Sequence, residues 1–357
     1  MNRRAFLKQS ALLALLASGH GASAAGPDAE LDPLIPAWEA WKAAHLQQTG
    51  RVIDARQDQA SHSEGQGYGI RLAVAFRDRA AFDAMDRWTQ ANLAVRPDTL
   101  LAWRWRPDLP ERIDDFNNAS DGDLFYAWSL ALAAERWSAP DYLARATAMA
   151  NDLAASCVVA RPDRPGDRVL LPAAFGFVKD DAAVLNVSYM MPRALAELGR
   201  ASGQGALEAA AEGALRLMSD LAQTGSMPDW VRASPEGLGP AEGFASHTGY
   251  EAMRVPLFLC WSGQTAHPAV ATHAALPDDG GDIDATPVVF DRTSGDVLQH
   301  SGEAGYRALQ ALTRCAAGNM GFSTMPPFDP EQTYYPATLH LFAMLCARQT
   351  LRSCTPI

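Results

Sequence analysis

The sequence predicts one large all-α domain that follows a short export signal. Apolar residues recur at intervals of three and four along most of the chain, which is the pattern of amphipathic helices. Alternating, strand-like segments are rare, and no change in composition marks a linker between domains. With 357 residues, 48% of them hydrophobic, the chain has enough apolar material for a substantial core. These observations favour a single helical domain over residues 25–357.

The first 24 residues have the three parts of an export signal. Arg3 and Arg4 open a positive segment, residues 11–17 form a short apolar run, and Ala22 to Ala24 provide a small-residue end. The paired arginines are typical of a twin-arginine signal, which implies export of an already folded protein. The apolar run is too short for a stable membrane anchor. We expect removal of the signal near Ala24 and a periplasmic or secreted protein without stable membrane insertion.

Charge and cysteine content exclude several classes of partner. Loss of the signal removes three basic residues and no acids, so the formal charge changes from −11 to −14. Such a surface repels nucleic acid and anionic membranes and is compatible with neutral ligands such as sugars. The five cysteines are scattered, and none has the spacing of a metal site. Export permits a disulfide, but the spacing indicates no particular pair. The sequence indicates neither a metal nor a cofactor.

The expected helices follow one another through the whole domain. They cover residues 35–47, 70–76, 81–93, 124–137, 142–157, 185–198, 206–221, 253–261, 306–316 and 337–351. Two short segments, 168–172 and 287–290, are the strand candidates. The glycine- and proline-rich connectors carry most of the polar and aromatic residues of interest. Loops on a rigid scaffold commonly carry function, so we expect the residues of the functional site in these connectors.

The segment SHSEGQGYG at residues 61–69 is the first candidate. It places one carboxylate, Glu64, and His62 among three glycines that allow a ligand to approach closely. A purely structural interpretation is equally simple: Ser63 caps a helix and Glu64 sits in its first turn. We interpret His62 as an orienting or structural group rather than a metal ligand. The other segments must supply partners for Glu64 before the catalytic interpretation is preferred.

Two further polar clusters could supply those partners. Residues 117–123 include Asn118 and Asp121 and lead into the 124–137 helix, where one side chain could be a cap and the others could bind sugar hydroxyls. Glu251 and Arg254 are three residues apart. They could form an ordinary helical ion pair, or Arg254 could keep a general base ionised.

Aromatic residues lie in loops beside these acids. Trp103, Trp105 and Trp230 could stack on pyranose rings, whereas Trp88 and Trp128 fit a core role. There is no HExxH, G-x-S-x-G or Walker motif. Paired carboxylates with polar loops and exposed tryptophans suit glycoside hydrolysis, in which one carboxyl group protonates the leaving oxygen and another assists water.

Several longer motifs resemble those of glycoside hydrolase family 8, especially the exported endoglucanases of bacterial cellulose-synthesis operons. The resemblance extends over residues 38–351. Its motifs are GRVID at 50–54, SHSEGQGYG at 61–69, NNASDGDL at 117–124, GFVKD at 176–180, NVSY at 186–189, PDW at 228–230, YEAMRVP at 250–256 and the tyrosines at 334 and 335. The resemblance implies an (α/α)6 barrel with an active-site cleft at one end and hydrolysis with inversion.

The resemblance also implies roles for individual residues. Glu64 corresponds to the general acid and Asp121 to the residue that contacts the sugar at the cleavage point. The usual base is an aspartate, and this chain has Glu251 at that position. The longer side chain leaves three outcomes: Glu251 is the base in an adjusted pocket, another acid replaces it, or the protein binds glucan with little or no catalysis. The residues expected to bind substrate are Tyr189, Trp103, Trp105, Trp230, Arg254, Asn118 and Tyr250.

The expected function is therefore an exported endo-β-1,4-glucanase that needs no cofactor and trims nascent cellulose in functional association with the cellulose synthase machinery. One alternative is a hydrolase of the same family that acts on xylan or chitosan. Another is a non-catalytic factor that binds cellulose or assists its assembly.

Overall fold

The computed structural model describes residues 29–278, 280–318 and 323–355. The predicted export signal lies outside these residues. The described chain contains the α-helices α1 (Ile35–His45), α2 (Ser63–Ala75), α3 (Arg79–Asn92), α4 (Ser120–Trp137), α5 (Pro140–Cys157), α6 (Pro192–Ser202), α7 (Gly205–Ala222), α8 (Arg254–Trp261), α9 (Pro268–Ala274), α10 (Ala304–Gly318) and α11 (Tyr334–Thr350). None of them is both long enough and apolar enough to cross a membrane.

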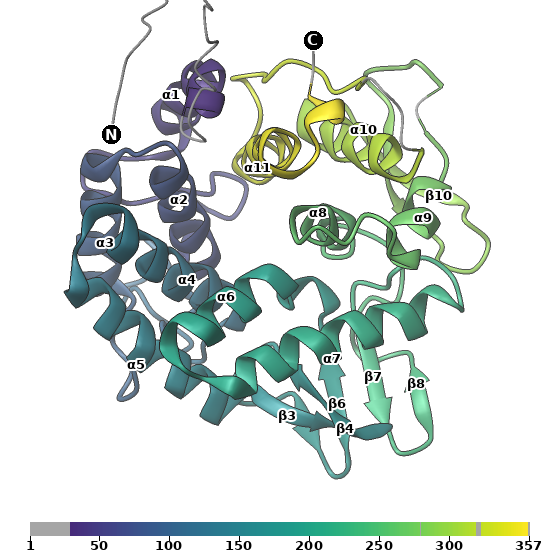
Figure 1. The fold of residues 1–357 in the computed structure, drawn as a ribbon, viewed down its shortest axis with the longest axis horizontal. Coiled ribbons are helices and arrows are strands. Elements are labelled where there is room, and N and C mark those ends of the chain that lie inside the picture. Colours follow the sequence, from purple (N-terminus) through teal and green to yellow (C-terminus); the bar gives the residue numbers. More distant parts are fainter. Residues whose placement is uncertain (1–28, 279, 319–322, 356–357) are drawn as a thin grey trace, which may run out of the picture.

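The helices form a ring in which sequence neighbours pack against each other (Figure 1). Helix α2 packs on α3 and α4, α6 on α7, and α10 on α11, while α11 also contacts α1 and so joins the two ends of the chain. Helices α2, α4, α8 and α11 are buried along most of their length, whereas α3, α7 and α10 bury one face. This is the predicted (α/α)6 barrel, with the fully buried helices towards the middle.

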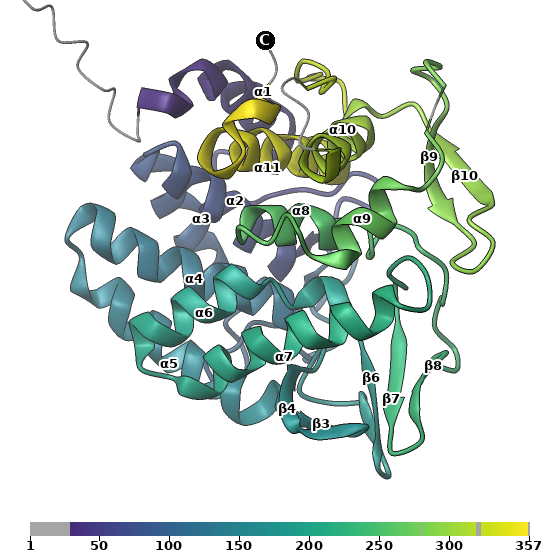
Figure 2. The same ribbon diagram turned by 45° about the vertical axis from the view of Figure 1, so that its right-hand side comes forward.

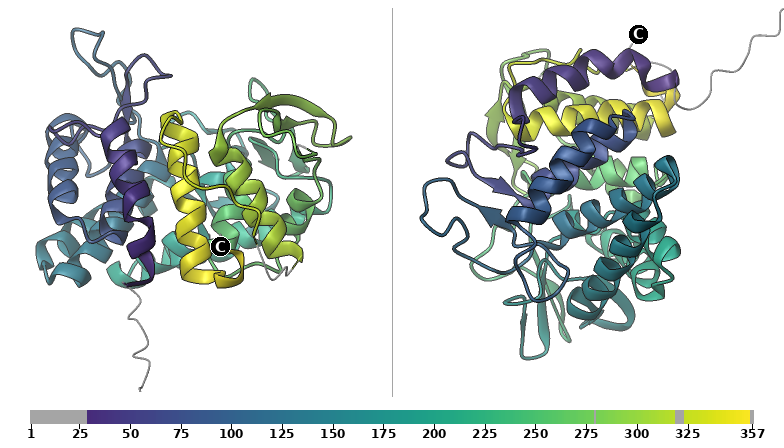
Figure 3. Two further views of the ribbon diagram at one scale, coloured as in Figure 1. Left: turned by 90° about the horizontal axis from the view of Figure 1, so that it is seen from above. Right: turned by 90° about the vertical axis from the view of Figure 1, so that its left-hand side faces the viewer.

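Short strands decorate the barrel. They are β1 (Ser61–His62), β2 (Arg104–Trp105), β3 (Val158–Arg161), β4 (Arg164–Leu170), β5 (Val178–Lys179), β6 (Ala182–Leu185), β7 (Val231–Ser234), β8 (Gly237–Gly239), β9 (Thr286–Phe290) and β10 (Val297–Ser301). All pair antiparallel, as three two-stranded ribbons and one four-stranded sheet in the order β5-β6-β7-β8. Figure 2 shows β3, β4, β6, β7 and β8 gathered beyond α7 and the β9–β10 hairpin apart from them. Seen from above, the loop after α1 and this hairpin project at the same end of the molecule (Figure 3).

The sequence located most helices and missed some of their starts. The segment expected to be helical at 185–198 is wrong in its first half, because residue 185 ends β6 and α6 begins only at Pro192. Proline lacks the N–H that a helix interior requires and fits the first position of a helix. Helix α9 lies in a connector where none was expected. Both strand candidates coincide with observed strands, β4 and β9, although β4 ends at Leu170.

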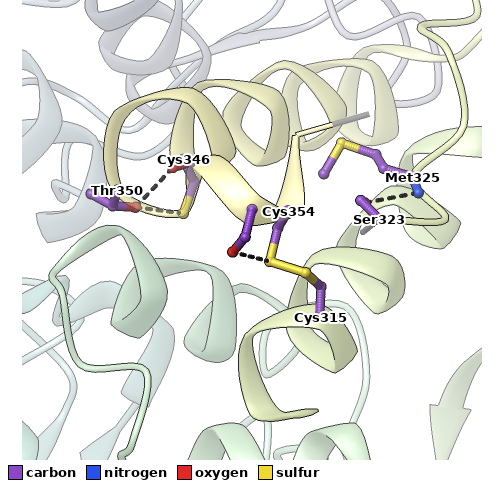
Figure 4. Close-up of a disulfide and its surroundings, with 7 residues drawn as sticks. Cys315, Ser323, Met325, Cys346, Thr350 and Cys354 are labelled. Carbon is purple, nitrogen blue, oxygen red and sulfur yellow. Dashed lines mark hydrogen bonds between the residues drawn. A yellow bond between two sulfur atoms is a disulfide. The ribbon is translucent and has the colours of Figure 1, made fainter. Parts of the chain in front are cut away.

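A disulfide fixes the end of the described chain to the barrel. Cys315 in α10 is bonded to Cys354 in a short 3₁₀ helix, Arg352–Cys354, that follows α11 (Figure 4). The other three cysteines, Cys157, Cys260 and Cys346, are buried and free. The sequence alone did not indicate this pairing, because the two cysteines are brought together by the packing of α10 on α11.

Candidate active site

One buried arginine joins the three candidate carboxylates. Arg254 is the first residue of α8, and its side chain is only 1% exposed. Its Nη1 lies 2.8 Å from Glu64 Oε2 and 3.3 Å from Asp121 Oδ2 and also donates to Tyr68 Oη at 2.9 Å. Its Nη2 donates to Glu251 Oε2. Residues separated by as many as 190 positions in the chain therefore meet at one guanidinium group.

Glu64 occupies the first turn of α2, where His62 rather than Ser63 is the N-cap. His62 Nδ1 accepts a hydrogen bond from Gly65 N at 3.0 Å, and its Nε2 lies 3.6 Å from Asp54 Oδ2. The second oxygen of Glu64, Oε1, accepts from the hydroxyl group of Tyr334 at 3.3 Å. The expected cap at Ser63 is wrong, and His62 orients the start of the helix as expected. Glu64 is thus held at both of its carboxylate oxygens, and His62 caps the helix in place of Ser63.

Asp121 lies in the first turn of α4 and is almost completely buried. The N-cap position there is Ala119, which has no side chain for capping, so neither Ser120 nor Asp121 has the structural role that the sequence allowed. Burial, which removes water from the carboxyl group, and the negative charges of Glu64 and Glu251 together raise the pKa of Asp121 to about 7, although Arg254 opposes this shift. Asp121 is therefore more readily protonated than an exposed aspartate.

Glu251 lies in the turn that leads into α8. Besides Arg254, its Oε2 accepts from Asn186 Nδ2 at 3.1 Å and from Ser188 Oγ at 3.3 Å. Every side-chain hydrogen bond found for Glu251 in the described part of the chain ends on Oε2. The other oxygen, Oε1, keeps its lone pairs for a water molecule or a substrate hydroxyl group. The pocket therefore accommodates a glutamate at this position.

Glu64 and Glu251 both open into one cavity of about 480 Å³. Tyr250, expected to bind substrate, lines the same cavity and is 39% exposed. The hydroxyl group of Tyr335 donates to the backbone oxygen of Tyr250 at 2.6 Å and steadies this wall. The remaining lining residues are largely polar: Asp54, Arg56, Gln57, Ser301, Glu303, Tyr306, Thr333 and Pro336. A polar cavity bordered by aromatic rings suits a sugar chain.

Aromatic rings extend from the carboxylates on another side. The ring of Tyr189 lies 5.5 Å from the Arg254 guanidinium, and Trp230 follows 6.2 Å from Tyr189. Phe177 is nearly parallel to Trp230, with ring centres 5.9 Å apart, and Phe244 lies 4.7 Å from Trp230. The structure thus brings Tyr189 and Trp230 close to the carboxylates and adds two phenylalanines that the sequence did not single out.

The other predicted binding residues have protein partners. The guanidinium groups of Arg51 and Arg112 lie 4.3 and 5.3 Å from the ring centre of Trp105, which also meets Trp88 edge to face. Asn118 is buried; its amide donates to Asp123 and accepts from Ala174 N at 2.7 Å. Trp103 Nε1 donates to Asp115. None of the three is among the described residues that line the cavity with Glu64 and Glu251, and their contact with sugar stays a prediction.

Several residues of the site escaped the sequence analysis as individuals. Asn186 and Ser188, which hold Glu251, and Tyr68 and Tyr334, which help to hold Arg254 and Glu64, all fall within motifs noticed for their family resemblance. Their roles depend on contacts between distant segments. Asp229, which lies in the PDW motif, was likewise not singled out as an individual residue. Its Oδ1 accepts the N–H groups of Gly249 and Ala252 at 2.8 and 2.9 Å and so shapes the turn that carries Glu251.

Among the described residues, no group of three or more histidine, cysteine or acidic side chains is placed to hold a metal ion. An (α/α)6 barrel with two carboxylates facing one cavity and a third beneath them defines a glycosidase. The chain belongs to glycosyl hydrolases family 8, because residues 6–349 match the model of that family.

Known relatives agree with this assignment. A probable endoglucanase of Novacetimonas hansenii is 32% identical over 327 residues, which cover 90% of this chain and 93% of the relative. An endoglucanase of Cellulomonas uda is 34% identical over 229 residues, 63% of each chain. The solved endo-β-1,4-glucanase CMCax of Acetobacter xylinum superimposes with a TM-score of 0.78 at 29% identity, covering 91% of this chain and 99% of that one. The predicted family and barrel are confirmed.

Proposed function

We propose that this glycosidase is an endo-acting β-1,4-glucanase that hydrolyses its substrate with inversion at the anomeric carbon. The observation that carries the proposal is the arrangement of Glu64 and Glu251 in one cavity with Arg254 between them. The substrate class is supported by the relatives described as endoglucanases and by the structural neighbour described as an endo-β-1,4-glucanase.

In the proposed reaction, Glu64 is the general acid. It transfers its proton to the oxygen that links two glucosyl units, and the bond from that oxygen to the anomeric carbon breaks. Glu64 lines the cavity, so its carboxyl group is accessible to a bound sugar chain, as a general acid requires. Tyr334 and Arg254 fix the position of the side chain, so the proton is presented in one direction.

Glu251 is the proposed general base. Its Oε2 is occupied by Arg254, Asn186 and Ser188, and Oε1 accepts a proton from the water molecule that attacks the anomeric carbon. Inverting enzymes separate their two carboxyl groups by about 6.5–9.5 Å to seat this water. Arg254 donates to Glu64 through Nη1 and to Glu251 through Nη2, so its guanidinium group bridges the two side chains. The hydroxyl group of this water joins the anomeric carbon, and its proton is taken up by Glu251. Exchange with solvent then removes the proton from Glu251 and returns one to Glu64.

Asp121 is the proposed contact to the sugar at the cleavage point. The proposal is supported by its position, since Asp121 Oδ2 lies 3.3 Å from the same Arg254 Nη1 that donates to Glu64. Positive charge develops on the sugar in the transition state, and the neighbouring carboxylates stabilise it.

Replacement of Glu64 tests the proposal most directly. We expect Glu64→Gln to abolish the release of reducing ends from carboxymethyl- or hydroxyethyl-cellulose, since glutamine cannot donate the proton. The thermal unfolding curve should stay unchanged. Glu212→Gln, an exposed acid on α7, is the matched control and should retain full rate. Full activity of Glu64→Gln would refute the assignment of the acid. NMR of the first product should show the α-anomer, and a β-anomer would exclude inversion.

We also propose that the protein is exported, with a twin-arginine signal removed near Ala24, and works beside the cellulose synthase machinery. The disulfide between Cys315 and Cys354 supports export, because such bonds persist in oxidising compartments. Replacement of both Arg3 and Arg4 by lysine should retain the full-length protein in the cytoplasm of the producing cell. Mass spectrometry of the cytoplasmic and exported fractions measures the processing and the location of the protein. Unchanged processing and export in that variant would contradict a twin-arginine signal.

A further inference from the structure

Two of the most exposed aromatic side chains of the described chain border a second cavity. Phe175 is 66% exposed and Phe116 is 58% exposed, although large apolar side chains are normally shielded from water. The cavity beside them measures about 330 Å³, and neither residue belongs to the cavity that contains Glu64 and Glu251. Nothing in the catalytic arrangement requires these two rings.

The two phenylalanines are held in place by their backbone. Asn117 Nδ2 donates to Phe175 O at 3.0 Å, and Arg96 donates through Nη1 to Phe116 O. The guanidinium of Arg96 also lies 5.8 Å from the ring centre of Phe175. The rings therefore project from a fixed frame and need little ordering when a ligand binds.

The charged side chains around the rings already have hydrogen-bond partners. Arg96 makes a two-pronged contact with Asp98, at 2.8 and 2.6 Å. Asp115 accepts from the Trp103 indole at 3.0 Å and from Asn117 N at 2.8 Å. The charged side chains that line this cavity, Arg96, Asp98 and Asp115, thus already have hydrogen-bond partners within the protein. Two apolar ring faces next to satisfied polar groups suit a neutral molecule that combines apolar faces with hydroxyl groups, as a pyranose does.

This second cavity is connected to the catalytic carboxylates by short backbone links. Asn117 O accepts from Trp103 N at 2.9 Å, and Trp103 O accepts from Ser63 N at 2.9 Å, the residue directly before Glu64. Asn117 also precedes Asp121 by four residues at the start of α4. Phe116 and Phe175 thus belong to loop segments that are hydrogen-bonded, through Asn117 and Trp103, to the segment that carries Glu64, which favours a polysaccharide chain that extends beyond Glu64 as their ligand.

We propose that Phe116 and Phe175 form an outer binding site for a glucosyl unit of the same β-glucan chain that is cleaved at Glu64. This inference rests on the proposed function. The outer site contacts only chains long enough to extend beyond the cleavage point, so it sets the preference of the enzyme for long substrates over short ones.

The test compares the double variant Phe116→Ala/Phe175→Ala with wild type on cellohexaose and cellotetraose. We expect kcat/KM for cellohexaose to fall about tenfold, equivalent to about 1.4 kcal/mol, with most of the change in KM. The value for cellotetraose should stay unchanged. The aromatic variant Phe116→Tyr/Phe175→Trp should restore the wild-type preference. Leu143→Ala, which removes an exposed apolar side chain from α5, is the control.

Two results would overturn the inference. Identical kinetics of wild type and double variant on both substrates would show that the rings do not contact the glucan, as expected if they bind another protein. Equal losses on both substrates would show that the substitutions disturb the catalytic residues instead. Calorimetry in a Glu64→Gln background measures cellohexaose binding without hydrolysis. An inactive wild type refutes the proposed function, whereas weaker binding by the double variant in that background still supports the outer site.

Discussion

Glu251 is the residue where this chain departs from the usual pattern of its family. Glutamate is one methylene group longer than aspartate, and the structure surrounds the longer side chain with matching partners. Arg254, Asn186 and Ser188 all bind its Oε2. A shorter aspartate would withdraw from these three donors. The outcome in which Glu251 is the base in an adjusted pocket is thus favoured by the observed contacts.

The corresponding prediction concerns Glu251→Asp. Since a displacement near 1 Å can cost about a hundredfold in rate, we expect kcat on a soluble β-glucan to fall by about that factor. Glu251→Gln removes the base altogether and should reduce kcat at least as strongly, by a factor of about 10² to 10⁴. Initial rates of reducing-end release measure both. A rise in turnover for Glu251→Asp would mean that glutamate fits this pocket poorly, and wild-type turnover for Glu251→Gln would place the base elsewhere.

At the scale of the elements, the crossing of α2 and α4 positions the site. The two helices start side by side because glycines allow their backbones to touch. A Cβ atom on Gly122 would lie 2.3 Å from Ser63 Oγ and 2.6 Å from Glu64 N, and one on Gly67 would lie 2.8 Å from Gly122 O. Such distances are far below normal packing contacts, so any side chain at these positions forces the helices apart.

Gly122→Ala should therefore impair catalysis although it changes no catalytic side chain. We expect a loss of about a hundredfold in kcat, because Glu64 moves relative to Glu251, together with a lower unfolding temperature. Activity assays and thermal unfolding measure the two effects. Gly205→Ala, at the start of α7, meets no atom within 4 Å and is the control. Wild-type kcat in Gly122→Ala would show that the helices adjust without consequence for the site.

The sequence was informative about elements and weak about their junctions. Long apolar periodicities located most of the helices correctly, since one buried stripe is enough to specify them. The glycine-rich 61–69 segment resembled a turn, yet α2 begins at Ser63 and contains most of it. Glycines there serve the close helix crossing, which no local pattern reveals. The same limit applies to Ser188, whose partner Glu251 lies 63 residues away. Glu64, Asp121 and Arg254 were found because they stand in distinctive motifs.

At the scale of the whole molecule, the barrel is closed by contacts between its first and last helices. Helix α11 packs on both α1 and α10, and the disulfide then ties the segment after α11 back to α10 (Figure 4). The bonded cysteines are 39 residues apart in sequence. Cross-linking a loop of this size restricts the unfolded chain and typically stabilises the folded state by about 2–4 kcal/mol.

Reduction of this bond should lower the thermal stability of the protein. We expect the unfolding temperature of wild type to fall when dithiothreitol is added and to approach that of Cys354→Ala, which should not respond to the reductant. Differential scanning fluorimetry of both proteins, with and without reductant, measures the effect. If wild type unfolds at the same temperature under both conditions, the cross-link contributes nothing to stability.

The single guanidinium shared by three carboxylates has a consequence for substrate choice. Together these groups carry a net charge of −2 when all are ionised, which a buried site resists by retaining a proton. Burial raises the pKa of Asp121, so this carboxyl group is the one that retains the proton. A glucosamine unit would bring its own ammonium charge, compensate one of the carboxylates and disturb the charge balance that the site keeps with a neutral sugar. Although the acidic surface attracts polycations, the site should therefore cleave cello-oligosaccharides faster than chitosan oligosaccharides of equal length; the opposite order in a matched assay would show that the ammonium group is tolerated.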